Sequence, residues 1–169
     1  LCRRGKVLYW GVSEWTPAQV AEAQGICRQN GWQPMVSNQP RYSLMYRYPE
    51  REMFPLCERE GIGQVNFSPL AHGVLSGQYK AGEPIPEGTR AADPTQNAIM
   101  MGLYWGDENL GKARQFAEIA AEMGVKPAQL AIAWCLRLSV LTSVISGVTS
   151  VEQLKGNLVA ADVKVPDDV

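Results

Sequence analysis

Side chains that could bind a ligand follow apolar runs at three points of the chain. Ser13 and Glu14 come directly after the run 7–12, and Gln39 ends the next such run. A hydroxyl, a carboxylate and a carboxamide together offer hydrogen-bond donors and acceptors to an amide group. Phe67 ends a third run, where an aromatic ring could stack on a flat heterocycle. Taken singly, each of these residues also suits a structural place, in a solvated turn or, for Phe67, in the core.

The strongest physical signal is for phosphate binding after a fourth apolar run, which ends at Ser146. Gly147 is small, and Thr149 or Ser150 would cap a helix that follows. The first N–H groups of a helix and its dipole attract phosphate, and many barrel proteins bind phosphate after their last strands. An ordinary capped helix without a ligand is the alternative interpretation.

Acid–base and metal chemistry have weaker support. His72 is the single histidine, and no acidic residue lies at a triad-like place near it. One histidine and scattered cysteines do not form a metal site. The cysteines lack metal-ligand spacing, and three of them fall in apolar helical patterns, which predicts free buried thiols in a reducing compartment. The four are Cys2, Cys27, Cys57 and Cys135.

The composition is that of an ordinary globular protein of one domain. The chain has 169 residues, 46% of them hydrophobic and 20% charged, and a net charge of −1. This balance gives no attraction to nucleic acid or to an anionic membrane surface. The apolar runs are far shorter than the roughly 20 residues of a membrane span, and no signal-peptide pattern opens the chain. We therefore expect a cytoplasmic protein.

The elements that would position these residues alternate between strand and helix. Thr16 and Pro17 are typical of a helix start, and Pro55 should kink or split its helix. The segment 80–106 has no sustained period, as expected of a lid or a disordered loop. The predicted strands are 7–12, 34–39, 64–68 and 141–146, and the predicted helices are 17–30, 49–60, 70–75, 107–123, 127–138 and 150–161.

Four strand–helix repeats predict an α/β fold with a parallel sheet and right-handed crossovers. Four such units form half of a (β/α)8 barrel or a small open doubly wound sheet, and the pattern alone does not separate these. The first strand lacks the Gly-x-Gly-x-x-Gly turn of a dinucleotide-binding doubly wound sheet, which weakens that alternative.

Several motifs, taken in order, resemble the aldo-keto reductase family. The resemblance covers essentially the whole chain and places it at strands five to eight of that family's (β/α)8 TIM barrel, as a fragment whose first half is missing. The branch it resembles contains the potassium-channel beta subunits and their bacterial relatives. The motifs are Gly5-Lys6-x-x-x-x-Gly11-Val12-Ser13, Gln39-x-x-Tyr42, Phe67-Ser68-Pro69-Leu70-Ala71-x-Gly73-x-Leu75-Ser76-Gly77-x-Tyr79 and Ile145-Ser146-Gly147-Val148-Thr149-Ser150-x-x-Gln153-Leu154-x-x-Asn157.

The resemblance implies a bound NADP. Ser13 and Gln39 would hold the nicotinamide carboxamide, with Glu14 beside them, and Phe67 would stack on the ring. Arg90 would reach the adenosine end. The pyrophosphate and its phosphate arm would lie along Ser68, Pro69, Leu70, Gly73, Ser76 and Gln78, and the 2′-phosphate and adenine along Gly147, Thr149, Gln153 and Asn157.

Two positions depart from the family pattern. Gln78 replaces a common lysine, which removes one charge near the phosphates. Gly156 replaces a common glutamate, which removes a partner of the adenine amino group.

The implied activity is NADPH-dependent reduction of a carbonyl in a small-molecule substrate, an aldehyde or ketone, to an alcohol. The family's catalytic Asp, Tyr, Lys and His come from earlier strands, so we expect no catalytic residue here, and His72 is not the family's histidine. The alternative is a non-catalytic nucleotide-binding regulatory subunit resembling a potassium-channel beta subunit. A half barrel would also leave two sheet edges and an apolar interior exposed, so we expect the chain to be dimeric, molten or insoluble.

Overall fold

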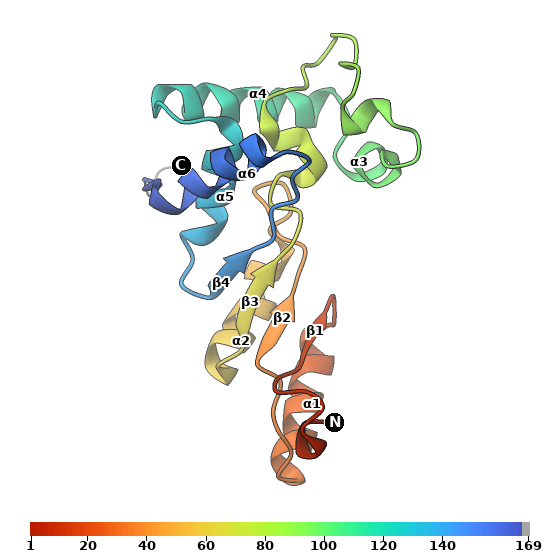
Figure 1. Ribbon diagram of the computed structural model, residues 1–169, viewed down its shortest axis with the longest axis vertical. Helices are drawn as coiled ribbons and strands as arrows, with labels where there is room; N and C mark the ends of the chain where they lie inside the picture. The colour runs from red at the N-terminus through yellow and green to blue at the C-terminus, as the bar shows by residue number, and fades with distance from the viewer. Residues whose placement is uncertain (167–169) are drawn as a thin grey trace.

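A computed structural model of the chain, which describes residues 1–166, contains one parallel sheet of four strands (Figure 1). The order β1-β2-β3-β4 follows the chain, so the winding never reverses as it does in a doubly wound sheet. This confirms the predicted α/β class and is consistent with part of a barrel. The strands are β1 (Gly11–Ser13), β2 (Ser37–Gln39), β3 (Gly63–Asn66) and β4 (Leu141–Val144).

Each strand is shorter than its apolar run predicted. Gly11 pairs with Ser37, and Ser37 in turn pairs with Gly63, so regular pairing begins at this level of the sheet. Before it, the Trp10 side chain packs against the helices and its carbonyl accepts from the Val36 N–H at 3.0 Å, whereas Leu8 and Tyr9 are exposed. Beyond β4 the pairing thins to single contacts, among them the Ile145 N–H donating to the Asn66 carbonyl at 2.8 Å. Apolar character therefore marked neither the paired strand nor a wholly buried run, since Leu8, Tyr9 and Ile145 are exposed.

The first helix, α1 (Pro17–Gln29), begins as predicted. The Thr16 hydroxyl accepts from the Gln19 N–H at 3.3 Å, and the Gln19 side chain accepts from the Thr16 N–H at 2.9 Å. This reciprocal capping satisfies two N–H groups that a helix end leaves free. The buried residues of α1 are Val20, Gln24 and Cys27. Val20 packs in one apolar cluster with Met35, which precedes β2.

The predicted helix 49–60 is divided in two, but not by a kink at Pro55. A 3-10 turn, η2 (Tyr48–Glu50), is followed by α2 (Met53–Glu60). Pro55 lies in the first turn of α2, where its missing N–H would have had no helical partner. The break falls upstream, at Arg51 and Glu52.

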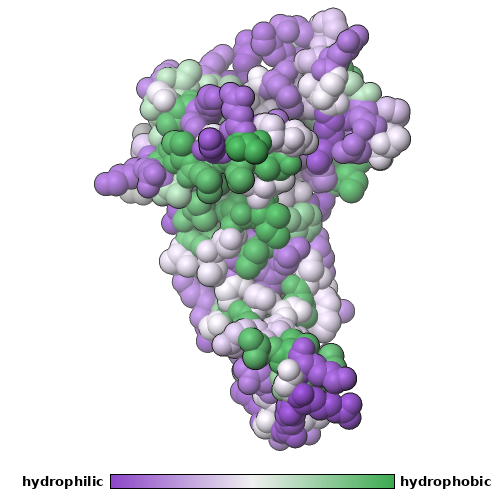
Figure 2. All heavy atoms as spheres, viewed as in Figure 1, coloured by the Kyte–Doolittle hydropathy of each residue, from purple (hydrophilic) through white to green (hydrophobic). Residues whose placement is uncertain are grey.

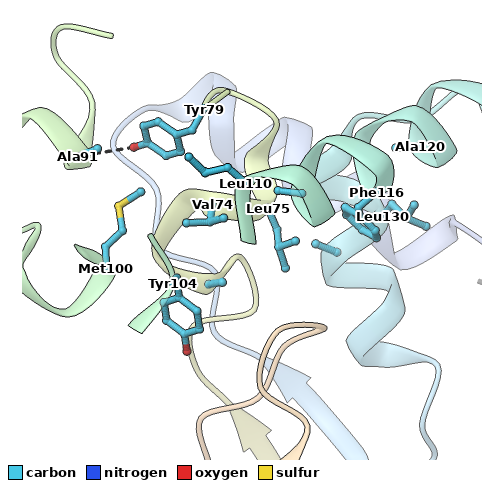
Figure 3. Close-up of a cluster of buried hydrophobic side chains, with 13 residues drawn as sticks. Val74, Leu75, Tyr79, Ala91, Met100, Tyr104, Leu110, Phe116, Ala120 and Leu130 are labelled. Atoms are coloured by element: carbon cyan, nitrogen blue, oxygen red, sulfur yellow. Dashed lines mark hydrogen bonds between the residues drawn. The ribbon is translucent and has the colours of Figure 1, made fainter. Parts of the chain in front are cut away.

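Part of the predicted loop 80–106 is helical, so the expectation of a disordered loop was wrong, whereas the expectation of a lid stays a prediction. The segment contains η4 (Arg90–Ala92) and α3 (Ala98–Leu103). Met100 and Tyr104 are buried in the same cluster as Val74 and Leu75 from the turn η3 (Ala71–Ser76), and the Ala91 N–H donates to the Tyr79 hydroxyl (Figure 3). Burial of a few large side chains, rather than a repeating pattern, orders this segment.

The predicted helix 70–75 is not an α-helix, because positive φ angles at His72 and Gly73 break it into the 3-10 turn η3. The predicted helices 107–123, 127–138 and 150–161 form with shifted ends. The buried face of α4 (Asp107–Glu122) includes Leu110 and Ala113, and α5 (Pro127–Leu136) is buried all round from Gln129 to Cys135. Ser150 caps α6 (Val151–Leu158), which continues as a 3-10 turn, η5 (Val159–Asp162). At the other end a short 3-10 turn, η1 (Cys2–Arg4), opens the chain. Residues 167–169, the end of the predicted tail, lie outside the described part.

The sheet face away from α1 and α2 is small and polar, not apolar as expected. Val12 packs against the helices, so its neighbours Gly11 and Ser13 point to the other face. The strand register places further residues on that face, and all of them except Val65 are polar or glycine. They are Ser37, Gln39, Gly63, Val65, Thr142 and Ser143. A Cβ atom on Gly11 would lie 2.2 Å from the Ser37 hydroxyl oxygen, so the backbones approach too closely for any larger residue.

The cysteines are free, as the sequence predicted. Cys27, Cys57 and Cys135 are buried, and Cys2 is partly exposed. Burial raises the pKa of the Cys135 thiol to about 12 and also raises the pKa of Cys57. These thiols are therefore protonated and act as small apolar groups in the core.

Candidate functional site

A cavity of about 450 Å³ opens at the carboxyl ends of β3 and β4. Its walls come from the end of β3, from η3 and η4, from the loop that joins β4 to α6, and from α6 itself, with Ala128 of α5. Ligands of parallel α/β proteins bind at this end of the strands. The lining residues are Phe67, Ser68, Pro69, Leu70, His72, Gly73, Ser76, Gln78, Gly88, Thr89, Arg90, Ala128, Ile145, Ser146, Gly147, Thr149, Gln153 and Asn157.

Every site residue predicted from Phe67 onward lines this one cavity. Arg90 and Thr149, far apart in the chain, both reach it, as the predicted barrel geometry required. The juxtaposition matches the expected layout of a phosphate-binding wall, while the role of each residue toward a ligand stays a prediction.

Ser13, Glu14 and Gln39 lie at the ends of the neighbouring strands and do not line the cavity. The Ser13 hydroxyl donates to the Gln39 carbonyl at 2.8 Å, and the Glu14 carboxylate accepts from the Arg41 N–H at 2.7 Å. Both contacts tie the ends of β1 and β2 together. The Gln39 side chain is exposed, so its amide is free to meet a ligand that extends along the strand ends.

The loop between β3 and η3 has an unusual backbone. Ser68, Ala71 and His72 have φ angles of 56°, 47° and 58°, a region that non-glycine residues rarely adopt. The loop is held there by the Ala71 N–H donating to the Ser68 carbonyl at 3.0 Å and by complete burial of Ala71 and Val74. Strained residues of this kind persist only where the surrounding structure fixes them, and they cluster at ligand and active sites.

His72 also lines the cavity. Its Nε2 lies 3.3 Å from the Ser68 hydroxyl and its Nδ1 lies 3.2 Å from a guanidinium nitrogen of Arg90. Burial lowers the pKa of the imidazole, and the positive charges of Arg90 and Arg41 lower it further. His72 is therefore neutral near pH 7. No motif in the sequence indicated that His72 belongs to the site, because the direction of its side chain depends on the left-handed backbone at its own position.

The start of α6 is already capped by the chain itself. The Gln153 side-chain oxygen accepts from the Thr149 N–H at 2.8 Å and from its hydroxyl at 3.0 Å, while Ser150 caps Gln153. Asn157 donates to the Ser146 hydroxyl at 2.7 Å. A phosphate group at this helix start would compete with the Gln153 oxygen for Thr149.

Gly156, where the family commonly has a glutamate, borders open space. A Cβ atom there would meet nothing within 4 Å. Its carbonyl accepts from the Gln129 side chain at 2.8 Å, which joins α6 to α5. Packing therefore does not require glycine at this position.

Two other cavities lie away from the strand ends. One, of about 510 Å³, is mostly apolar and lies between the first residues and Trp32, and the other, of about 610 Å³, is lined by Arg137 and Lys164 among others. Within residues 1–166, no three His, Cys, Asp or Glu side chains converge where they could hold a metal ion. None of the helices described is long and apolar enough to cross a membrane.

The structure thus combines a parallel sheet, a cavity at the carboxyl ends of its strands, a strained loop and an arginine in the cavity wall. The model of the Aldo/keto reductase family matches residues 1–169. The chain therefore belongs to the aldo/keto reductase family, which confirms the resemblance seen in its motifs.

Two similar curated proteins carry the name "Probable voltage-gated potassium channel subunit beta". The one from Oryza sativa subsp. japonica is 39% identical over 161 residues, which is 94% of this chain and 48% of the relative. The one from Arabidopsis thaliana is 40% identical over 162 residues, which is 95% of this chain and 48% of the relative. The chain thus spans about half the length of the curated relatives it matches.

Proposed function

We propose that this chain is the cofactor-binding half of an NADP-dependent aldo/keto reductase, corresponding to strands five to eight of the barrel. The observation that carries the proposal is the single cavity that gathers Phe67, Arg90 and Thr149. Its volume of about 450 Å³ lies within the usual range of small-molecule sites, about 300–1,000 Å³. The four free cysteines support a reducing compartment such as the cytoplasm.

The residues present suit a dinucleotide phosphate. The Arg90 guanidinium offers a planar fork for phosphate oxygens, and the start of α6 offers N–H donors at Thr149 once Gln153 gives way. Phe67 provides a ring at the end of β3 where a nicotinamide could stack. Ser13 and Gln39, at the next strand ends, would orient the carboxamide.

When bound, the nicotinamide would supply hydride transfer to a small-molecule carbonyl compound. This chain would bind and orient the cofactor and form part of the substrate wall. The acid that protonates the carbonyl oxygen belongs, by the family resemblance, to earlier strands, so the chain by itself should bind the cofactor without turning over substrate.

Glycine variants test the binding function. Titration with NADPH, followed by nicotinamide fluorescence, should show saturable binding to the chain. Gly73→Val should abolish it, because φ is +106° there and the new side chain would press on Gln78 and Tyr79. Gly82→Val is the matched control, since Gly82 also has positive φ, +75°, but borders open space. Binding that survives Gly73→Val, or that no condition reveals in the wild type, would contradict the proposal.

A regulatory subunit that binds nucleotide without catalysis is the second candidate. The names of the two plant relatives favour it. Assay of a longer protein that includes the preceding strands separates the two: NADPH oxidation dependent on an aldehyde or ketone supports the reductase, and cofactor binding without turnover supports the regulatory subunit.

A further inference from the structure

His72 joins the strained loop of the cavity to Arg90, which lines the same cavity from η4. Arginine can only donate, so the His72 Nδ1, 3.2 Å from the Arg90 guanidinium, must be the unprotonated acceptor. The proton of the neutral ring is then on Nε2, which donates to the Ser68 hydroxyl at 3.3 Å. One tautomer alone satisfies both contacts.

The surroundings keep His72 in that form. The ring stacks on Tyr104, with centroids 5.8 Å apart. The charged groups that act on it are Arg90 and Arg41, both positive. Arg41 comes from the segment after β2 and is itself held by Tyr46, which its guanidinium faces at 3.8 Å. Glu14 accepts from the backbone of Arg41, not from the imidazole.

We propose that neutral His72 is a positioning residue that holds Arg90 toward the cavity, and that its protonation releases Arg90 and weakens preference for a 2′-phosphorylated dinucleotide. This inference depends on the proposed function, because it assigns the anion that Arg90 meets. It extends that function by making cofactor preference dependent on pH through a residue outside the family motifs.

The direction of the pH effect follows from the geometry. A second proton on the ring, at Nδ1, would place an N–H donor opposite the N–H donors of Arg90, across the present 3.2 Å contact. Both side chains would then carry a positive charge. Arg90 is exposed and can swing into solvent, whereas His72 is fixed by Ser68 and Tyr104. Binding of NADP+ should therefore weaken at acid pH more than binding of NAD+. The 2′-phosphate also gains a proton near pH 6, so variants must be compared at each pH.

Calorimetric titration of the chain with NADP+ and NAD+ at pH 7.5 and pH 5.5 tests this. His72→Phe keeps a ring but loses the acceptor, and should weaken NADP+ by roughly tenfold at pH 7.5 with less than about twofold change for NAD+. His72→Gln keeps an acceptor and a donor and should restore most of that loss. For His72→Gln, the ratio of NADP+ affinity to NAD+ affinity should also fall less between pH 7.5 and pH 5.5 than it does for the wild type.

The possible results separate the two proposals. Failure of the wild type to bind either nucleotide would overturn the proposed function. Binding of both nucleotides that His72→Phe leaves unchanged, or a pH response of His72→Gln equal to that of the wild type, would overturn the role of His72 alone.

A spectroscopic measurement keeps the inference testable if these variants fold poorly. His72 is the single histidine of the chain, so the imidazole nitrogens give one unambiguous set of NMR signals. The wild type should show the Nε2–H tautomer at pH 7, and Arg90→Gln should raise the pKa of the ring. The Nδ1–H tautomer, or a ring unaffected by Arg90→Gln, would contradict the proposal.

Discussion

Among individual side chains at the cavity, Arg90 offers the most direct test of the proposed ligand. Arg90→Ala should weaken NADPH more than NADH by roughly 1–3 kcal/mol, the range of a charge-assisted hydrogen bond. Titrating both cofactors against wild type and variant by fluorescence measures this. Arg114→Ala, at an exposed ion pair on α4, is the control. Equal losses for both cofactors would mean that Arg90 braces its loop rather than meeting a 2′-phosphate.

Gly156 offers a gain rather than a loss. Gly156→Glu would restore the carboxylate that the family commonly has there, and the open space around Gly156 accepts it. We expect tighter binding of both NADPH and NADH by about 1 kcal/mol, the value of one hydrogen bond to the adenine amino group. Gly111→Glu on α4, another helical glycine in open space, shares the helix-propensity gain without the new contact. Unchanged affinity in Gly156→Glu would show that adenine lies elsewhere.

At the scale of elements, the structure shows which sequence signals were reliable. The cap at Thr16 was predictable because it depends on neighbouring residues alone. Helix α3 was not, since Met100 is ordered by contacts from distant segments. The walls of the cavity were predictable through motifs, but the contact of His72 with Arg90 required the left-handed backbone of the loop. Local chemistry could be predicted from sequence, and side-chain direction could not.

A polar contact between elements joins η2 to the rest of the fold. The Tyr42 hydroxyl donates to Glu50 at 2.6 Å, while its ring stacks on Trp134 of α5 at 5.5 Å. Tyr42→Phe should reduce the free energy of unfolding by about 1–2 kcal/mol, because it removes a hydrogen bond to a charged group and leaves the packing intact. Urea denaturation at pH 7 measures the loss. Tyr48→Phe, at an exposed ring, should change little.

The same contact has a predictable pH dependence. Burial opposes ionisation of Glu50, but hydrogen bonds from Arg47 and Tyr42 outweigh it and hold the pKa of the carboxyl below its usual range. A lowered folded-state pKa gives stability that is present above the unfolded value of about 4.3 and lost as pH falls through the folded value. The difference between wild type and Tyr42→Phe should therefore shrink between pH 5 and pH 3. A constant difference would mean that Glu50 is not its source.

For the whole molecule, the exposed apolar surface predicts self-association. β1 and β4 form the edges of the sheet, and Figure 2 shows hydrophobic residues gathered over β4 and α6. Leu154 and Leu158 of α6 and Ile145, which follows β4, are exposed at 43%, 64% and 41%. Patches of this kind bind other chains or aggregate. We expect sedimentation to find dimers or larger species.

One substitution separates this patch from apolar surface elsewhere. Leu158→Lys should shift the chain toward monomer, because it places a charge in the patch. Ile99→Lys, which changes an exposed apolar residue on α3, should not. A chain that sediments as a monomer and unfolds in one cooperative transition would contradict the prediction.

The small residues shared by three neighbouring strands restrict what could complete this sheet. Gly11, Ser37 and Gly63 lie side by side in register, so three neighbouring strands carry small residues at this level. The centre of a closed barrel is filled by layers of side chains, mostly bulky ones. A second copy of this chain would bring the same small residues to that level and leave it underfilled. Strands that close the cylinder must therefore carry large side chains at that level, a complementarity that can be sought in any sequence suspected of joining this one.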